Sequence, residues 1–171
     1  MFSGKSTELI RRCRNYEAIE KTVVVFNHVL DTRCIDNSVQ THSKTSKTAI
    51  KTKLLMSYKN IINDPPDVIA IDEAQFFQDL YEFVQYMERY HIVIIIAGLD
   101  GDCYRKPFGQ ILNCIPLANE VTKLHALCMI KKDGTYASFT KRHASIEPQT
   151  NQVDIGSQDK YMAVCRSEYF N

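Results

Sequence analysis

The sequence lacks the features that mark membrane, secreted and strongly basic proteins. No apolar run among its 171 residues is long enough to span a bilayer, and nothing at its start resembles a signal peptide. The formal net charge is only +1, so the overall field attracts neither nucleic acid nor a membrane surface. Internal repeats and low-complexity tracts are absent as well. We therefore expect a cytoplasmic protein that has neither nucleic acid nor a membrane as a partner.

Closely spaced cysteine pairs are also missing. The six cysteines have no regular spacing, and none lies in a C-x-x-C pair. In a cytosolic protein this pattern indicates reduced thiols that pack mostly as small apolar residues. With 44% apolar residues, the chain can bury a core of its own as one domain, or as one domain with a small appendage.

What the sequence does contain is the second half of a phosphate-binding loop. Gly4-Lys5-Ser6 matches the end of the pattern G-x-x-x-x-G-K-[ST], whose first glycine would lie before Met1. Lys5 would supply a positive charge to the β- and γ-phosphates, and the Ser6 hydroxyl would hold Mg²⁺ beside the N–H groups of a helix start. Taken alone, the same three residues also fit an ordinary helix start.

Apolar patterns alternate between helices and strands over the first part of the chain. The expected helices run from Ser6 to about Glu20 and over 80–87, and the expected buried strands cover 22–26, 67–71 and 92–97. This alternation predicts an α/β fold with a parallel sheet flanked by helices. We expect the polar segment 31–53 to be mostly a solvated surface loop, because no aromatic residues separate its lysines for stacking on nucleic-acid bases.

The character of the sequence changes after residue 123. From Leu124 onwards, short alternating pieces such as 135–139 are separated by glycine and proline. We therefore predict an α/β nucleotide-binding domain over 1–123 and a small β-rich domain over 124–171.

Two acids follow the apolar strand expected over 67–71. An acid at the end of a buried strand orients Mg²⁺ in phosphate-binding proteins, a role that suits Asp72. Glu73 beside it could accept a proton from an attacking hydroxyl, which is the role of a general base. Paired acids at a strand end also occur in solvated turns, but together with Gly4-Lys5-Ser6 they favour a phosphoryl-transfer site.

Several groups of residues together resemble the type II thymidine kinases. They are Ser3-Gly4-Lys5-Ser6-Thr7-Glu8-Leu9, Asp31-Thr32-Arg33, Ile71-Asp72-Glu73-Ala74-Gln75-Phe76-Phe77, Leu99-Asp100-Gly101 with Arg105-Lys106-Pro107-Phe108-Gly109, and Asp159-Lys160-Tyr161. Their order and spacing match along essentially the whole chain. The resemblance implies a RecA-like P-loop fold with a lasso loop that closes over thymidine. It also implies transfer of the ATP γ-phosphoryl group to the 5′-hydroxyl of thymidine with Mg²⁺, and a homotetramer.

The resemblance assigns roles to residues of this chain. It makes Glu73 the catalytic base, and Ser6 and Asp72 the Mg²⁺ ligands. The residues expected to bind ATP are Met1, Phe2, Ser3, Gly4, Lys5, Ser6, Thr7, Asp31, Thr32, Arg33, Asp72 and Gln75. Those expected to bind thymidine are Phe76, Leu99, Cys103, Phe108, the lasso residues Gln152, Val153, Asp154, Ile155 and Gly156, and Tyr161. For Phe76, Leu99 and Phe108, plain core packing is an equally good interpretation.

The chain departs from the family at its zinc site. Family members of this type commonly hold a structural Zn²⁺ with two C-x-x-C pairs near the lasso. Here each pair keeps only its first cysteine, Cys128 or Cys165, and two thiolates would not hold zinc tightly. The alternatives are a salt bridge between Lys131 and Glu168, a contact between Cys128 and Cys165, and a mixed metal site completed by His125 and His143.

A second departure concerns the start of the chain. The first glycine of the loop and the first strand of the family would both precede Met1. We therefore expect either that the intact gene product has more N-terminal residues or that this form binds ATP poorly and aggregates. Without that strand, the strand over 68–71 is expected to show an unpaired apolar edge.

Cys103 is a third departure, because the family usually has an aromatic residue there. The smaller side chain predicts looser selectivity among deoxynucleosides.

Two other functions fit parts of the sequence. One is a P-loop ATPase or helicase-like motor, for which the chain lacks the further motifs. The other is a non-catalytic relative that only binds nucleotide or a protein partner.

Overall fold

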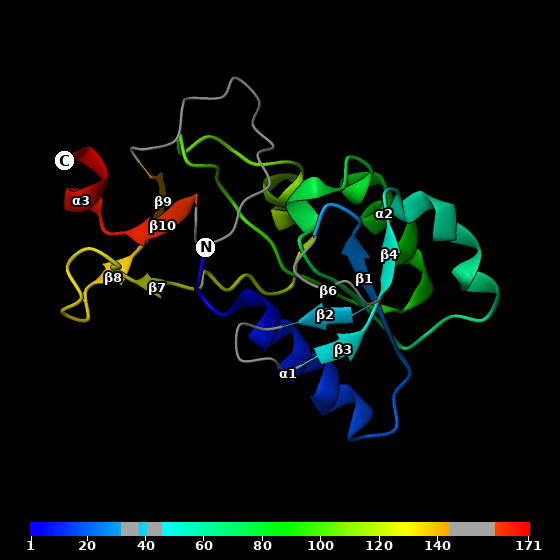
Figure 1. Ribbon diagram of the computed structural model, residues 1–171. Coiled ribbons are helices and arrows are strands. Elements are labelled where there is room, and N and C mark those ends of the chain that lie inside the picture. Colours follow the sequence, from blue (N-terminus) through cyan, green and yellow to red (C-terminus); the bar gives the residue numbers. More distant parts are fainter. Residues whose placement is uncertain (32–37, 41–45, 144–159) are drawn as a thin grey trace.

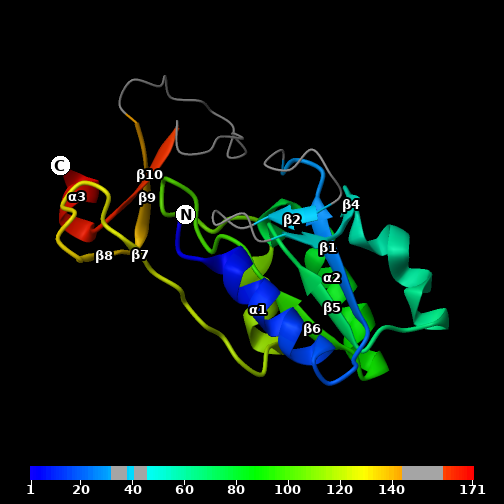
Figure 2. The ribbon, with the colours of Figure 1, turned by 60° about the horizontal axis from the view of Figure 1, so that its bottom comes forward.

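The computed structural model describes residues 1–31, 38–40, 46–143 and 160–171. The chain forms a larger lobe built on a four-stranded sheet and a smaller lobe of short strands and one helix (Figure 1). An extended segment joins the lobes, and the N-terminus lies beside the smaller lobe in both views of the ribbon (Figure 2).

The strands of the main sheet all run parallel, in the order β4-β1-β5-β6. The elements of this lobe are α1 (Lys5–Glu17), β1 (Val23–His28), β4 (Ile50–Thr52), η1 (Leu55–Asn63), β5 (Val68–Ile71), η2 (Ala74–Phe76), α2 (Leu80–Met87), η3 (Glu88–Tyr90), β6 (Val93–Ile96) and η4 (Ile111–Leu117), where η is a 3₁₀-helix. The predicted α/β class and its three predicted strands are confirmed.

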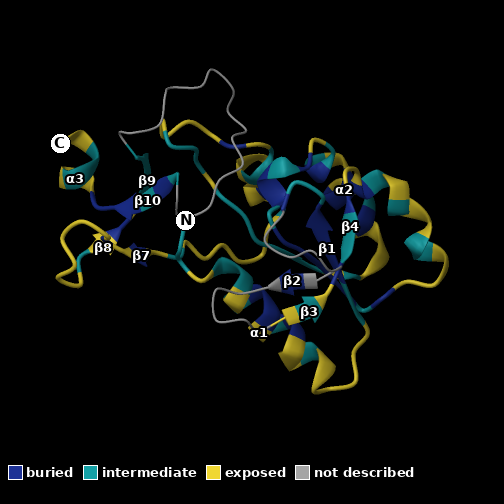
Figure 3. Ribbon diagram, viewed as in Figure 1, coloured by how far each residue is buried: buried dark blue, intermediate teal, exposed yellow. Residues whose placement is uncertain are grey.

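Strand β5 lies between two apolar cores. Ile69 and Ile71 pack into the cluster that contains α2, whereas Ala70 packs into the cluster that contains α1. Every residue of β5 is fully buried. Strand β1, its neighbour in the sheet, is coloured mainly as buried in Figure 3. Because both faces of β5 are covered, its sequence is a continuous apolar run instead of an alternating one.

The helices bury one stripe each against this sheet. Leu9, Ile10 and Cys13 form the buried stripe of α1, at the spacing of an amphipathic helix. Phe83 of α2 is completely buried and meets Phe26 of β1 edge to face, with ring centroids 6.1 Å apart. No helix in the described part of the chain is long and apolar enough to cross a membrane.

The prediction that 31–53 is mostly a surface loop is wrong for its described residues. A small antiparallel pair, β2 (Ser38–Gln40) with β3 (Ser46–Thr48), leads into β4, which extends the main sheet by pairing with β1. β4 is an edge strand and carries no long β-branched run, so its sequence resembles a polar loop. Residues 32–37 and 41–45 lie outside the described part.

The expectation of an unpaired edge along 68–71 is also wrong. β5 pairs with β1 on one side and with β6 on the other, Val68 lying opposite Val93. The crossover through α2 returns the chain beside β5, so β6 takes the outer position. A groove of about 870 Å³, lined by residues of α1 and β6, follows that edge, where Val93 is 38% exposed.

The smaller lobe is β-rich, as its sequence predicts. Its elements are β7 (Ala126–Leu127), β8 (Tyr136–Ala137), β9 (Phe139–Arg142), β10 (Tyr161–Val164) and α3 (Arg166–Phe170). β7 pairs with β8 and β9 with β10, both antiparallel. A core of small residues, with Ala126, Cys128, Ala163 and Cys165 among its members, lies between the two pairs.

One contact region ties α3 to the larger lobe. The Tyr169 hydroxyl donates to the carbonyl oxygen of Cys103 at 2.8 Å. The Arg105 guanidinium lies 4.7 Å from the ring centroids of both Tyr169 and Phe170, a cation–π arrangement. The loop that contains Cys103 and Arg105 is therefore held by the end of the chain.

We predict that Phe83→Ala lowers the free energy of unfolding by about 3–5 kcal/mol, because it empties a fully buried site. Urea unfolding followed by circular dichroism measures the change. Ile19→Ala, at a side chain that is 64% exposed, is the control and should change the value by about 0.5 kcal/mol or less. A loss below about 1 kcal/mol for Phe83→Ala would contradict this account of the core.

Candidate active site

The start of α1 has the form of an anion-binding helix N-terminus. Gly4 precedes the helix with φ +77°, in the left-handed region where glycine is free of Cβ strain, and the helix begins at Lys5. The carbonyl oxygen of Gly4 accepts the N–H of Glu8 at 2.9 Å, which closes the first turn. The remaining N–H groups of that turn carry the positive end of the helix dipole, so they favour phosphate oxygens.

Asp72 stands where the buried strand β5 ends. Its backbone N–H donates to the carbonyl oxygen of Phe26 at 2.9 Å, which continues the pairing of β5 with β1 by one more bond. Its side chain is fully buried, and Oδ2 accepts the hydroxyl of Ser6 at 2.7 Å. The two residues predicted to share a metal ion are thus in contact, although they are far apart in the sequence.

Glu73 and Gln75 form the next part of the site. Glu73 has φ +49°, a left-handed conformation that is uncommon for a residue with a side chain and that turns the chain from β5 into η2. Gln75 Nε2 donates to Glu73 Oε2 at 2.6 Å, and Gln75 Oε1 accepts the N–H of Leu99 at 2.9 Å. Gln75, expected from the resemblance to bind ATP, therefore contacts the predicted base.

Aromatic rings gather next to these carboxylates. Phe76 and Phe108 meet edge to face, with centroids 5.7 Å apart and planes at 88°. His28 lies against Phe76 at 5.7 Å and against Phe77 at 4.8 Å. Sequence reasoning gave His28 no role, and the only signal was its place at the end of a β-branched run. The structure brings Phe76 and Phe108 together as one wall.

His28 is nearly buried, and this burial lowers the pKa of its imidazole below the ordinary value. A hydrogen bond with the backbone of Lys53 and the charge of Asp79 act in the opposite direction. His28 Nδ1 accepts the N–H of Leu30 at 3.1 Å. An acceptor nitrogen must be unprotonated, so this geometry agrees with a neutral ring.

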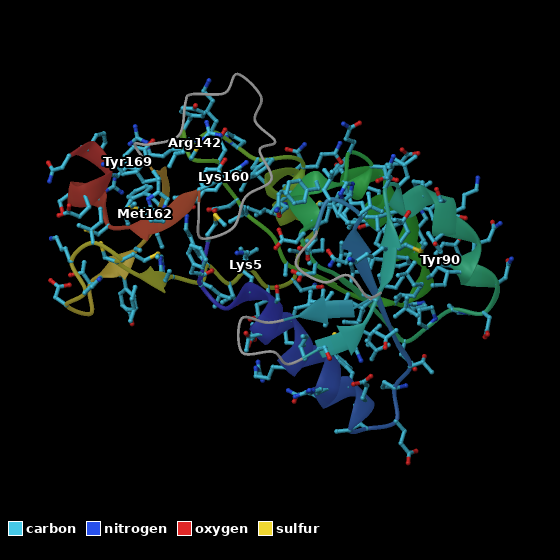
Figure 4. All side chains as sticks on the ribbon, viewed as in Figure 1. Lys5, Tyr90, Arg142, Lys160, Met162 and Tyr169 are labelled. Atoms are coloured by element: carbon cyan, nitrogen blue, oxygen red, sulfur yellow. The ribbon has the colours of Figure 1, made fainter. Side chains whose placement is uncertain are left out.

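Other predicted site residues lie around this centre or outside the described residues. Asp31 is buried at the end of the segment that follows β1, and its carboxylate accepts Asn27 Nδ2 at 2.9 Å. Tyr161 begins β10, and its ring lies 5.7 Å from the Arg142 guanidinium. Figure 4 shows Arg142, Lys160, Met162 and Tyr169 in the smaller lobe. Thr32, Arg33, Gln152, Val153, Asp154, Ile155 and Gly156 lie outside the described residues.

The two remaining cysteines of the zinc-site positions are in contact. Both are buried, and the Cys165 N–H points at Cys128 Sγ at 3.4 Å. The ring of His125 lies tilted against that of Tyr136, with centroids 5.8 Å apart. Glu168 is reached by Lys141, which donates to its carbonyl oxygen at 2.8 Å. Among the described residues, no three His, Cys, Asp or Glu side chains form a group that could hold a metal ion.

The geometry defines a class of protein. A helix start that can bind phosphate, a serine and an aspartate in contact at the carboxyl end of a parallel sheet, and a second carboxylate beside them are the parts with which P-loop phosphotransferases work. These proteins position and neutralise phosphate groups and rely little on covalent chemistry. The chain has the features of a P-loop phosphotransferase.

Comparison with known proteins makes the family specific. The sequence matches the thymidine kinase family over residues 1–169. Over 171 residues it is 43% identical to the thymidine kinase of Raccoon poxvirus, covering 100% of this chain and 93% of that protein. Over 171 residues it is 40% identical to the cytosolic thymidine kinase of Gallus gallus, covering 99% of this chain and 73% of that protein. The chain belongs to the thymidine kinase family, which confirms the resemblance seen in its motifs.

We predict that acidification from about pH 7.5 to about pH 5.5 lowers the thermal stability through His28. Burial disfavours its charged form in the folded state, so the unfolded chain binds the proton first, near the ordinary pKa of about 6.5. Stability is therefore lost as the pH falls through that value towards the lower folded-state pKa.

Thermal unfolding midpoints at the two pH values measure the effect. His28→Gln should reduce the difference between them, while His91→Asn, at an exposed histidine, should leave it unchanged. If His28→Gln keeps the full pH dependence, the destabilisation arises from other groups.

Proposed function

We propose that this chain transfers the γ-phosphoryl group of ATP to the 5′-hydroxyl of thymidine, with Glu73 as the general base. Membership of the thymidine kinase family supports the reaction. The observation that carries the assignment of the site is the 2.7 Å hydrogen bond from Ser6 to Asp72, directly beside Glu73. It joins the phosphate-binding helix start to the strand end at which a base can act.

Ser6 and Asp72 fit a magnesium ion. Mg²⁺ prefers hard oxygen ligands and takes few of them from the protein, and a hydroxyl in contact with a buried carboxylate offers such a pair. When bound, the ion would neutralise charge on the β- and γ-phosphate oxygens. Lys5, the first residue of α1, would add a second positive charge beside the same phosphates.

Glu73 suits the role of general base because the chain turns at this residue. Adjacent side chains on a strand point to opposite faces, but Glu73 leaves β5 in a left-handed conformation, so its carboxylate need not follow that alternation. A carboxylate within hydrogen-bond reach of the 5′-hydroxyl could take its proton as the oxygen attacks phosphorus. The transition state would then depend mainly on positioning and on charge neutralisation.

The thymidine pocket is proposed on the side of Glu73 where Phe76 and Phe108 meet. Leu99 and Cys103, in the segment that follows β6, and Tyr161, from the smaller lobe, would complete it. By resemblance to the family, Asp31 and Arg33 would contact the triphosphate, residues 152–156 would close over the base, and the enzyme would be a homotetramer. Cys128 and Cys165 would mark the remaining positions of the zinc ligands of the family.

Glu73→Gln should lower kcat for phosphate transfer from radiolabelled ATP to thymidine by at least about 100-fold, because the amide cannot accept the proton. The KM for ATP should change little, since the glutamine amide has nearly the same size and shape as the glutamate carboxylate. Glu88→Gln, at an exposed acid in η3, is the control and should retain activity. Wild-type protein that binds both substrates without transferring phosphate would instead support a non-catalytic relative.

Ser6→Ala should raise the Mg²⁺ concentration needed for half-maximal activity, because it removes one of the two oxygens proposed to hold the ion. A magnesium titration at saturating ATP and thymidine measures this requirement. Ser57→Ala, at an exposed serine in η1, should leave it unchanged. An unaltered magnesium requirement in Ser6→Ala would remove Ser6 from the proposed ion site.

A further inference from the structure

Gln75 is almost completely buried, at 3% exposure, yet it lies among polar groups of the proposed site. Both the nitrogen and the oxygen of its side-chain amide form hydrogen bonds. Nε2 donates to Glu73 Oε2 at 2.6 Å, and Oε1 accepts the backbone N–H of Leu99 at 2.9 Å. A single side chain thus connects the residue proposed as the base to the segment that follows β6.

The direction of the Gln75 amide is determined by its neighbours. A backbone N–H can only donate, so the atom that faces Leu99 must be the carbonyl oxygen. The NH₂ group is then the end that faces Glu73, where it meets a carboxylate oxygen that can accept. Flipping the amide would place two donors against each other at Leu99 and two acceptors against each other at Glu73.

Two glycines form the space around Gln75. A Cβ atom on Gly98 would come within 2.7 Å of Gln75 Oε1 and within 2.3 Å of Ile111 Cδ1. A Cβ atom on Gly109 would come within 2.1 Å of the Gln75 carbonyl oxygen, and Gly109 also has φ +60°. Any side chain at Gly109 would therefore have to move the Gln75 backbone. The close packing on both sides restricts Gln75 to its observed position.

The backbone of Glu73 does not fix where its side chain points. It stands at a turn with φ +49°, where the regular pairing of β5 has ended, so the sheet does not orient its side chain. A short hydrogen bond from an amide to a carboxylate oxygen is strengthened by the charge, so it restrains the position of Glu73 Oε2. Proton transfer is sensitive to this geometry, since small misplacements of a catalytic group reduce rates strongly.

The geometry points to Gln75 as the positioning residue of Glu73, in place of the ATP contact that the resemblance implied. This inference rests on the proposed function, in which Glu73 is the base. Gln75 holds the carboxylate from one end of its amide and the backbone of Leu99 from the other. Gln75 therefore fixes the position of the Glu73 carboxylate relative to the segment that carries Leu99 and Cys103.

The test compares Gln75→Met and Gln75→Glu with the wild-type chain. Methionine keeps the length of the side chain and removes both hydrogen bonds, whereas glutamate keeps an acceptor for Leu99 and places a second carboxylate against Glu73. Both variants should lose about 10- to 100-fold in kcat. The KM for ATP should stay within about threefold, because Gln75 does not act through ATP binding.

Gln110→Glu is the matched control. Gln110 Oε1 also accepts a backbone N–H, that of Tyr81, at 2.8 Å. This glutamine has a structural hydrogen bond of the same kind as Gln75, so its replacement should leave kcat within about twofold of the wild type. Thermal unfolding of all variants shows which of them fold, and Gln75→Met serves alone if the paired carboxylates prevent Gln75→Glu from folding.

A double mutant separates positioning from general damage. If Gln75 acts through the Glu73 carboxylate, adding Gln75→Met to Glu73→Gln should change the remaining rate by less than about twofold. The same loss in both backgrounds would overturn the inference, as would unchanged kcat in both folded single variants. If the wild type itself transfers no phosphate, the proposed function fails. If it transfers phosphate and Glu73→Gln is slower by at least about 100-fold, any failure belongs to the inference about Gln75 alone.

Discussion

The side-by-side parallel pairing of β1 and β5 is the constraint on which the site depends. The pairing runs from Val23 opposite Val68 to Phe26 opposite Ile71, and the N–H of Asp72 adds one more bond to Phe26. Because β5 is covered on both faces, it has a single register that buries its whole apolar run. A shift by one residue would turn Ile69 and Ile71 away from their core and would move Asp72 away from Ser6.

The same constraint explains why parts of the fold could be predicted and others could not. β1, β5 and β6 are continuous apolar runs because they are buried, and α1 and α2 have a clear apolar stripe, so their patterns are strong. β4 is a short edge strand with polar neighbours, and its sequence does not differ from that of a loop. The lateral order of strands depends on contacts between distant segments, which is why the apolar edge was assigned to β5 although β5 has a partner on each side.

The candidate site also contains some residues that local motifs predict and others that only the structure reveals. Ser6, Asp72 and Glu73 were found because each belongs to a local motif whose chemistry is known, and the structure places Ser6 in contact with Asp72. The contact between Gln75 and Glu73 was not predicted, since it depends on a turn after β5 and on the N–H of Leu99 in the segment that follows β6. His28 was missed for the same reason, because its neighbours Phe76 and Phe77 come from a different part of the chain. Motifs predict the reacting groups, whereas their supports come from tertiary packing.

The hydrogen bond from Tyr169 to the Cys103 carbonyl has a consequence for the motions of the protein. The loop around Cys103 follows β6 outside the strands of the sheet, and its own turn is closed by short-range bonds such as that from the Asp102 N–H to the Lys106 carbonyl oxygen. Local opening of a protein proceeds in cooperative units. Through Tyr169 and Arg105, this loop belongs to the same unit as the smaller lobe, whose core consists mainly of small side chains. Opening of the smaller lobe should therefore be coupled to opening of the loop beside the candidate nucleoside pocket.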